Sequence, residues 1–214
     1  MDDRATDRRE MVEKQIRRRG ICDPRVLEAL LEVHRHEFVP PESQARAYGD
    51  HPLPIGADQT ISQPYMVASM TECLSLTPES RVLEVGTGSG YQTAVLSTLT
   101  AEVFTIELLP KLSTHARLTL TRLGYENIHY RVCDGSRGWP EMAPFNGIII
   151  TAAAPQVPPA LIRQLADPGV LAAPIGSRGS QELVTVTRNE GRDVSRTHFK
   201  CTFVPLIGVE GFPD

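Results

Sequence analysis

The residues best suited to hold a ligand form a short glycine-rich segment in the middle of the chain. Residues 86–90 read Gly-Thr-Gly-Ser-Gly; they follow the apolar run Arg81–Val85 and precede a helical pattern that begins at Tyr91. A loop between a strand and a helix is where a doubly wound sheet places its ligand. Glycines there allow a sharp turn and a close approach of the backbone to a bound molecule. We therefore expect cofactor contacts from Gly86, Thr87, Gly88 and Gly90.

Two details distinguish this loop from the dinucleotide-binding fingerprint. The spacing is G-x-G-x-G rather than G-x-G-x-x-G, and an acid, Glu84, lies on the strand just before the loop. A carboxylate at that position would repel a pyrophosphate but attract a cationic amino-acid group. S-adenosylmethionine carries an ammonium and a sulfonium and no phosphate, so the loop suits this cofactor better than NAD. A structural turn without any ligand is the alternative.

Two further acids follow the next two predicted strands. Glu107 ends the strand Glu102–Ile106, where an acidic side chain can accept hydrogen bonds from ribose hydroxyls. Asp134 and Gly135 follow the strand Ile128–Val132 and could meet the amine and ring nitrogen of adenine, although Asp-Gly is also an ordinary turn. Acids at the carboxyl ends of three successive strands are a more specific signal than any one of them alone.

The elements around these residues predict an α/β fold with a doubly wound, Rossmann-like sheet. Strands alternate with helices from residue 81 to residue 175, which is typical of βαβ units and a parallel sheet. Glu182–Arg188 and His198–Val204 are strand-like and are separated by the turn formers Asn189-Glu190-Gly191, so we expect an antiparallel hairpin at the C-terminal end. The other expected strands are 145–151 and 170–175, and the expected helices are 91–99, 112–123 and 158–165.

The first 78 residues form an N-terminal helical extension. We predict helices over Arg8–Gly20, after the cap Asp23, and over Met66–Leu76. Tyr48–Pro64 is rich in proline, glycine and polar residues and lacks periodicity, so we expect a long irregular stretch. Within it, we expect the loop Leu53–Pro64 to lie over the cofactor and substrate as a lid. Residues 1–78 are thus interpreted as a helical and substrate-binding region and residues 79–214 as the cofactor-binding region, within one compact unit.

Composition narrows the class of protein further. The 214 residues carry a net charge of −4, so no global basic field attracts nucleic acid, despite the basic run Arg17–Arg19. No apolar run approaches a membrane span, and the charged start does not resemble a secretory signal. The four cysteines are widely spaced, which suggests free thiols rather than a metal or redox motif. We expect a cytoplasmic protein without a metal, a membrane partner or a nucleic-acid partner.

Several motifs resemble a known enzyme family. Glu84–Tyr91 resembles the first motif of class I S-adenosylmethionine-dependent methyltransferases. Thr60-Ile61-Ser62-Gln63-Pro64-Tyr65-Met66, preceded by Leu53-Pro54-Ile55-Gly56, is similar to the signature of the protein-L-isoaspartate (D-aspartate) O-methyltransferase family. Residues 143–149, 151–155, 168–171 and 203–206 are also similar to that family, so the resemblance extends from Gly20 to Leu206.

The resemblance implies a protein-repair reaction. The family transfers a methyl group from S-adenosylmethionine to the free α-carboxylate of isoaspartyl residues, which arise as Asn and Asp age, and releases S-adenosylhomocysteine. The ester collapses to a succinimide that can reopen to normal aspartate. The resemblance also implies isoaspartyl proteins and peptides as partners and a monomeric enzyme. The family's active-site serine falls on Ser62, and its cofactor contacts fall on Gln59, Thr60, Ile61, Ser62, Thr87, Glu107, Leu108, Asp134 and Gly135.

The expected chemistry agrees with the residues present. A carboxylate with a pKa of about 4 is already ionised at neutral pH, so its methylation needs no strong general base. Ser62 then acts as a donor that orients one carboxylate oxygen, and not as a nucleophile, because no triad-like His and Asp follow it. Three alternatives remain at this point: a methyltransferase for another small molecule or a nucleic acid, an NAD-dependent dehydrogenase, and a cofactor-binding module without catalysis.

Overall fold

The computed structural model describes residues 4–213 and contains a seven-stranded sheet in the order β5-β4-β3-β6-β7-β8-β9. β3 to β7 run parallel, whereas β8 and β9 are antiparallel to their neighbours. The predicted α/β class, the doubly wound sheet and the antiparallel C-terminal hairpin are therefore confirmed. The strands are β3 (Arg81–Val85), β4 (Glu102–Glu107), β5 (Ile128–Val132), β6 (Phe145–Ile150), β7 (Leu165–Ser177), β8 (Ser180–Asn189) and β9 (Arg192–Cys201).

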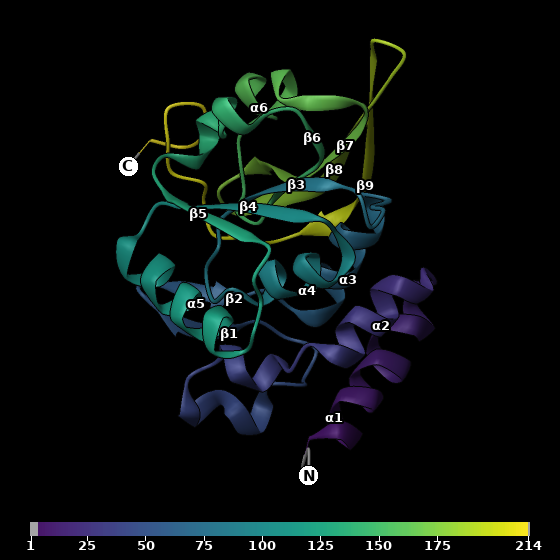
Figure 1. Ribbon diagram of the computed structural model, residues 1–214, viewed down its shortest axis with the longest axis vertical. Helices are drawn as coiled ribbons and strands as arrows, with labels where there is room; N and C mark the ends of the chain where they lie inside the picture. The colour runs from purple at the N-terminus through teal and green to yellow at the C-terminus, as the bar shows by residue number, and fades with distance from the viewer. Residues whose placement is uncertain (1–3, 214) are drawn as a thin grey trace.

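Helices cover both faces of this sheet. Figure 1 shows α3 (Pro64–Cys73), α4 (Tyr91–Leu99) and α5 (Pro110–Arg122) on one face, and the short α6 (Pro159–Arg163) on the other. The N-terminal helices lie outside the first group, farther from the sheet. They are α1 (Ala5–Glu10) and α2 (Pro24–Glu32), with a π-helix over Met11–Ile16 and 3-10 turns over Arg17–Arg19, Arg35–Phe38 and Pro41–Arg46. Two further 3-10 turns span Gly135–Arg137 and Pro140–Met142.

The core has two parts because successive side chains of a strand point to opposite faces of the sheet. Val82 packs in the cluster beneath helices α2 to α5, and Leu83 packs in the cluster beneath α6. Met11 and Ile16, near the start of the chain, belong to the same buried cluster as Val82. The N-terminal extension therefore shares a core with the sheet, which lets it contribute side chains to a site at the sheet edge.

The stop at Gly20 and the start of α2 after Asp23 are as predicted, but the first helical run begins at Ala5 rather than Arg8. Helix α3 likewise spans Pro64–Cys73 rather than Met66–Leu76. The helical run over Arg8–Gly20 changes from α to π and 3-10 geometry and stops at Gly20, whose φ is +101°. The Asp23 carboxylate accepts a hydrogen bond of 2.9 Å from the Arg25 N–H at the first turn of α2. This side-chain cap satisfies a donor that has no partner within the helix.

The prediction of an irregular loop over Tyr48–Pro64 was wrong. The segment contains the antiparallel hairpin of β1 (Leu53–Gly56) and β2 (Gln59–Ile61). Strands of four and three residues are too short to show a clear alternation, and Pro54 further obscures it. The turn residues Ala57 and Asp58 have φ values of +51° and +54° without being glycine, so the usual turn signature is missing as well.

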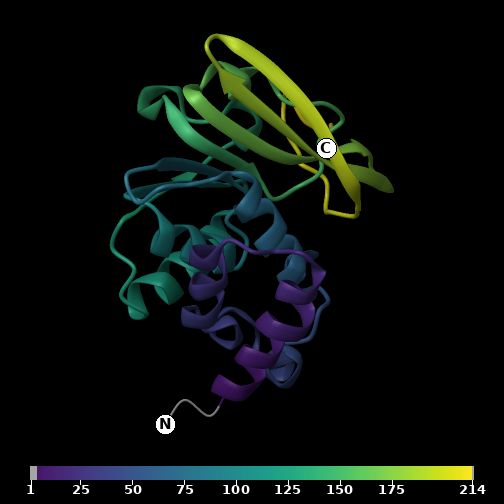
Figure 2. The ribbon, with the colours of Figure 1, turned by 90° about the vertical axis from the view of Figure 1, so that its right-hand side faces the viewer.

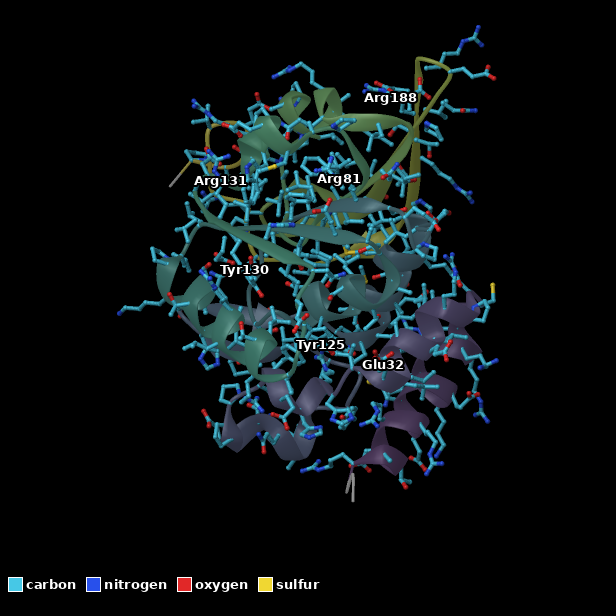
Figure 3. All side chains as sticks on the ribbon, viewed as in Figure 1. Glu32, Arg81, Tyr125, Tyr130, Arg131 and Arg188 are labelled. Atoms are coloured by element: carbon cyan, nitrogen blue, oxygen red, sulfur yellow. The ribbon has the colours of Figure 1, made fainter. Side chains whose placement is uncertain are left out.

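The C-terminal hairpin is longer than the sequence suggests. The turn at Glu190-Gly191 is confirmed, but β9 begins at Arg192 rather than His198. β9 is the outer edge of the sheet (Figure 2), and its first six residues are exposed, so no apolar alternation marks them. The Arg188 side chain lies beside this hairpin (Figure 3), where its Nε is 2.8 Å from the Asp193 carboxylate.

Candidate active site

A cavity of about 460 Å³ lies at the carboxyl ends of β3 and β4. Thr151 and Ala152, which directly follow β6, also line it. Chain order reverses there, because β4 and β6 flank β3 on opposite sides. Ligands of open α/β sheets bind at such a reversal. The volume falls within the range of about 300–1,000 Å³ that is typical of small-molecule sites.

The glycine loop forms one wall of this cavity in a conformation that excludes a side chain. Gly86 has a φ of +103°, and a Cβ added to it would collide with the hydroxyl of Thr151. That hydroxyl donates to the Gly86 carbonyl at 2.6 Å, and the Gly86 N–H donates to the Ile106 carbonyl at 2.8 Å. Hydrogen bonds from the end of β6 and from β4 therefore fix the loop on both sides, and its backbone lines the cavity.

Glu107 supports the same loop from the end of β4. One carboxylate oxygen accepts the Gly88 N–H at 2.8 Å, and the other accepts the Leu109 N–H at 3.0 Å. The side chain also lines the cavity, although it is only 7% exposed. Each carboxylate oxygen can accept a second hydrogen bond, so these contacts leave Glu107 able to bind a diol.

Glu84 is enclosed beneath the loop and does not line the cavity. It is fully buried, and its Oε2 accepts hydrogen bonds of 2.6 Å from both Thr93 and Thr105. Thr87 in the glycine loop lies 2.6 Å from the Thr105 hydroxyl, and it acts as the donor because Thr105 gives its proton to Glu84. Burial raises the pKa of Glu84 to about 8. The geometry thus gives Glu84 an indirect role through Thr87, and our prediction that it attracts the cofactor's ammonium directly stays untested.

Asp134 also points away from the cavity, toward the C-terminal segment. Its Oδ2 accepts the Val209 N–H at 2.8 Å, and its Oδ1 accepts the Ser136 N–H at 2.9 Å and the Ser136 hydroxyl at 2.7 Å. Burial opposes the charge, but these hydrogen bonds hold the pKa of the Asp134 carboxyl below its usual value. The carboxylate therefore fastens the segment after Leu206 to the end of β5, and its predicted contact with adenine stays a prediction.

Most of the residues predicted from the sequence lie around the one cavity. Gly90 is an exception, because it faces Ala116 and Leu120 of α5, and Glu84 and Asp134 are the other two. The ten that line it are Gln59, Thr60, Ile61, Ser62, Gly86, Thr87, Gly88, Glu107, Leu108 and Gly135.

Sequence reasoning missed several parts of this lining, and two of them lie outside the βα loops after β3 and β4. Thr151 follows β6 at the chain reversal, a position that a rule on strand ends could have found. The segment Val204–Ile207 closes the cavity, because the Ala153 N–H donates to the Val204 carbonyl and the Leu206 N–H donates to the Ala153 carbonyl, both at 2.7 Å. No local signal in the sequence predicts that the C-terminal segment returns to this position.

Ser62 lies between this cavity and a second one. The second cavity has a volume of about 540 Å³ and extends toward β9. Ser62 is half-buried, and its hydroxyl makes no hydrogen bond with any residue between 4 and 213. It is therefore free to bind a molecule in either cavity. Four residues line both cavities: Thr60, Ser62, Thr151 and Val204.

Asp50 holds the backbone on the C-terminal side of Ser62. Its Oδ2 accepts hydrogen bonds from the Gln63 amide at 2.7 Å and from Arg19 Nη1 at 2.6 Å. Its Oδ1 accepts the Tyr65 N–H at 3.3 Å, which caps the first turn of α3. The Arg19 guanidinium lies over the Tyr65 ring, 3.4 Å from the ring centroid. One carboxylate thus connects the N-terminal extension to both residues that flank Pro64.

The polar groups and apolar walls of this site suit S-adenosylmethionine. The backbone of the glycine loop lines the cavity directly, and Glu107 has free lone pairs that can accept hydrogen bonds from ribose hydroxyls. Val85, Ile106, Leu109 and Leu112 supply an apolar wall of the kind that an aromatic ring such as adenine packs against. Within residues 4–213 no group of three or more His, Cys, Asp and Glu could hold a metal ion, and no helix is long and apolar enough to span a bilayer.

Comparison with known sequences decides the family. A sequence profile described as protein-L-isoaspartate(D-aspartate) O-methyltransferase matches residues 6–211. The chain belongs to this family. A protein-L-isoaspartate O-methyltransferase from Methanoregula boonei is 51% identical over 211 residues, which cover 99% of this chain and 97% of that protein. Its counterpart from Pelotomaculum thermopropionicum is 51% identical over 215 residues, covering 100% of this chain and 93% of that protein.

Solved structures of the isoaspartate methyltransferase family have the same fold. A protein-L-isoaspartate O-methyltransferase superposes with a TM-score of 0.85 at 29% identity, covering 95% of this chain and 67% of that chain. A Plasmodium falciparum protein assigned to this enzyme class has a TM-score of 0.82 at 27% identity, covering 94% and 98%. The latter crystal structure holds S-adenosyl-L-homocysteine. The predicted family, the enzyme class and dependence on S-adenosylmethionine are therefore confirmed.

Proposed function

We propose that this enzyme methylates the free α-carboxylate of L-isoaspartyl residues in damaged proteins and peptides, with Ser62 orienting the acceptor. The supporting observation is the position of Ser62, whose unpaired hydroxyl lies in the wall between the cavity at the glycine loop and the cavity beside β9. A methyl transfer needs donor and acceptor to meet at one point from two sides. Ser62, Thr60 and Thr151 mark that point in this protein.

The cofactor-side residues have positioning roles. The backbone of Gly86 to Gly88 binds the amino-acid part of S-adenosylmethionine, Glu107 accepts the ribose hydroxyls, and Gly135 borders the adenine with Val85 and Leu108. Bound S-adenosylmethionine supplies an electrophilic methyl group on a sulfonium. Val204–Ile207 and the β1–β2 hairpin exclude water from the reacting atoms, because both line the cavity that contains them.

The acceptor-side residues need only to align an anion that is already formed. The acceptor carboxylate is ionised at neutral pH, so no side chain has to remove a proton. The Ser62 hydroxyl donates to one carboxylate oxygen and leaves the other oxygen directed at the methyl group. Alignment of this kind can supply much of the rate enhancement of a group transfer.

Labelled S-adenosylmethionine and a matched pair of peptides test this function. The peptides share one sequence and differ only in an L-isoaspartyl or a normal L-aspartyl residue. We expect alkali-labile label in the isoaspartyl peptide alone, because the isoaspartyl linkage leaves an α-carboxylate free. Equal labelling of both peptides would contradict the proposed acceptor, and labelling of neither would indicate a different methyl acceptor.

We further propose that the enzyme acts as a monomer in the cytoplasm, without a nucleic-acid or membrane partner. All four cysteines, Cys22, Cys73, Cys133 and Cys201, are free thiols, which is the usual state in a reducing compartment. The net charge of −4 makes strong attraction to phosphate backbones unfavourable. Light scattering during gel filtration measures the mass, and a mass of twice 23.6 kDa would contradict the monomer.

A further inference from the structure

The cavity beside β9 has an uneven charge. Its lining contains two cations, Arg19 and Lys200, and no aspartate or glutamate, although the chain as a whole carries a net charge of −4. Tyr65 and Phe199 form its aromatic wall, with ring centroids 5.9 Å apart. An acceptor groove of this composition favours a peptide with more negative charge than the one carboxylate that is methylated.

The two cations differ in how much of their charge is available. Arg19 is 2.6 Å from the Asp50 carboxylate and is stacked on Tyr65, so its charge is largely balanced. Lys200 is exposed and forms no ion pair with any residue in the described part of the chain. Glu182 is its neighbour across the β8–β9 ladder, but the two charged groups are not within ion-pair distance. Lys200 is therefore the cation that a ligand in this groove can use.

Ser62 and Lys200 share one cavity of about 540 Å³, so a peptide held at Ser62 brings its neighbouring residues into the cavity that Lys200 lines. Ser62 lines this cavity from the loop between β2 and α3, and Lys200 lines it from the edge strand β9. Consecutive Cα atoms in a peptide lie about 3.8 Å apart, and charges interact over roughly 8–10 Å in physiological salt. A side chain close in sequence to the methylated residue therefore enters the cavity that Lys200 lines while Ser62 holds the carboxylate.

We propose that this groove selects isoaspartyl sites that lie next to an acidic residue, with Lys200 as the specificity-determining side chain. The inference rests on the proposed function, since it concerns the acceptor of that reaction. An acidic neighbour gains an ion pair with Lys200, whereas a lysine neighbour is repelled. A partly exposed pair contributes up to about 1 kcal/mol, which corresponds to roughly fivefold in kcat/KM.

The test compares isoaspartyl peptides that carry Glu, Ala or Lys beside the damaged residue, on either side. We expect the wild-type enzyme to give a kcat/KM ratio of roughly five or more between the Glu and Lys peptides, and this ratio should fall as salt rises. Lys200→Glu should reverse the preference, and Lys200→Gln should bring the ratio near one. Arg192→Glu is the matched control, because Arg192 is exposed at the far end of the same strand and lines neither cavity.

Each outcome decides between the proposals. A wild-type ratio near one, or a ratio that Lys200→Glu leaves unchanged, overturns the role of Lys200. An equal loss of kcat/KM for all three peptides in Lys200→Gln would place Lys200 at the methylated carboxylate instead, which also overturns it. If Lys200→Glu does not fold, the salt dependence of the wild-type ratio and Lys200→Gln still decide. Failure of the wild-type enzyme to methylate the Ala peptide would count against the proposed function itself.

Discussion

The two sides of the active site are built in different ways. The centre of the cofactor side is made of residues at the ends of β3 and β4, and hydrogen bonds to the main chain of Gly86 and Gly88 fix the loop from both neighbouring strands. The acceptor side is assembled from segments far apart in the chain, represented by Arg19, Ser62 and Lys200. Its cations are exposed, whereas the carboxylates of the cofactor side are nearly or fully buried.

This difference separates the part of the site that must be constant from the part that can vary. A buried backbone cradle has one geometry, so a small change there removes binding. An exposed groove with side chains on long stems tolerates substitution and changes its preference gradually. We therefore expect a substitution in the glycine loop to have a larger effect than substitutions on the acceptor side.

The largest effect should follow Gly86→Ala. An alanine at a φ of +103° is strained, and its Cβ would displace the Thr151 hydroxyl that holds the loop. The loop of the variant can relax in the free enzyme but must return to the strained conformation to bind the ligand. A strain of about 2 kcal/mol in the bound form weakens binding roughly 30-fold. Titration calorimetry with S-adenosylhomocysteine measures the loss. Gly179→Ala is the control, because its added Cβ meets no atom within 4 Å. Equal affinity in the two variants would contradict a rigid cradle.

Ser62→Ala should have the next largest effect, and on turnover rather than on cofactor affinity. Because Ser62 is half-buried, we expect its loss to cost the lower end of the range for a donor to a charged acceptor, about 1.5 kcal/mol or roughly tenfold in rate. Ser195→Ala, at an exposed position of β9, is the control for loss of a hydroxyl. Initial rates and calorimetry separate the two quantities. Wild-type turnover would assign Ser62 to a structural turn, whereas a loss far beyond a hundredfold would favour a covalent role.

A smaller effect is expected from Asp50→Asn, which acts on Ser62 through its neighbours. The amide NH₂ of asparagine cannot accept from Arg19 and Gln63 as the carboxylate does, so the backbone around Pro64 loses part of its support. We expect kcat to fall about threefold to tenfold while S-adenosylhomocysteine binds normally. The control Glu79→Gln removes an exposed carboxylate elsewhere. Unchanged kcat with a lower melting temperature would limit Asp50 to a structural role.

The same contrast explains what the sequence could predict. The glycine loop and Glu107 follow strands with strong apolar patterns, so both their place in the fold and their proximity could be inferred. The β1–β2 hairpin could not, because its strands are short and its turn uses Ala57 and Asp58 at positive φ. The return of Val204–Ile207 to the cavity depends on pairing with Ala153, a long-range contact that no local pattern encodes. These two segments, which complete the walls of the cavity at the glycine loop, were therefore invisible except through the family resemblance.

We expect the smallest effect on catalysis from a substitution of Glu84. This side chain is buried beneath the glycine loop with Thr93 and Thr105, and its protonation can be tested through stability. Burial raises the pKa of Glu84 to about 8 from a usual value of 4.5; hydrogen bonds from Thr105 and Thr93 lower it in part, and the nearby Glu107 raises it. The folded state therefore holds this proton more tightly than the unfolded state does. The resulting stabilisation is fully present below a pH of about 4.5 and is lost as the pH rises to about 8.

Glu84→Gln removes this titration while keeping the shape of the side chain. The free energy of unfolding of the wild type, minus that of the variant, should fall steadily between about pH 5 and pH 8 and become constant above about pH 9. Urea unfolding at several pH values measures the difference, and Glu79→Gln, at an exposed position, should give a difference that stays flat over the same range. Parallel curves for the wild type and Glu84→Gln would show that Glu84 is ionised in the folded protein. The chain of hydroxyls from Thr93 and Thr105 to Thr87 would then hold a buried charge, and a direct attraction between Glu84 and the cofactor's ammonium would regain its basis.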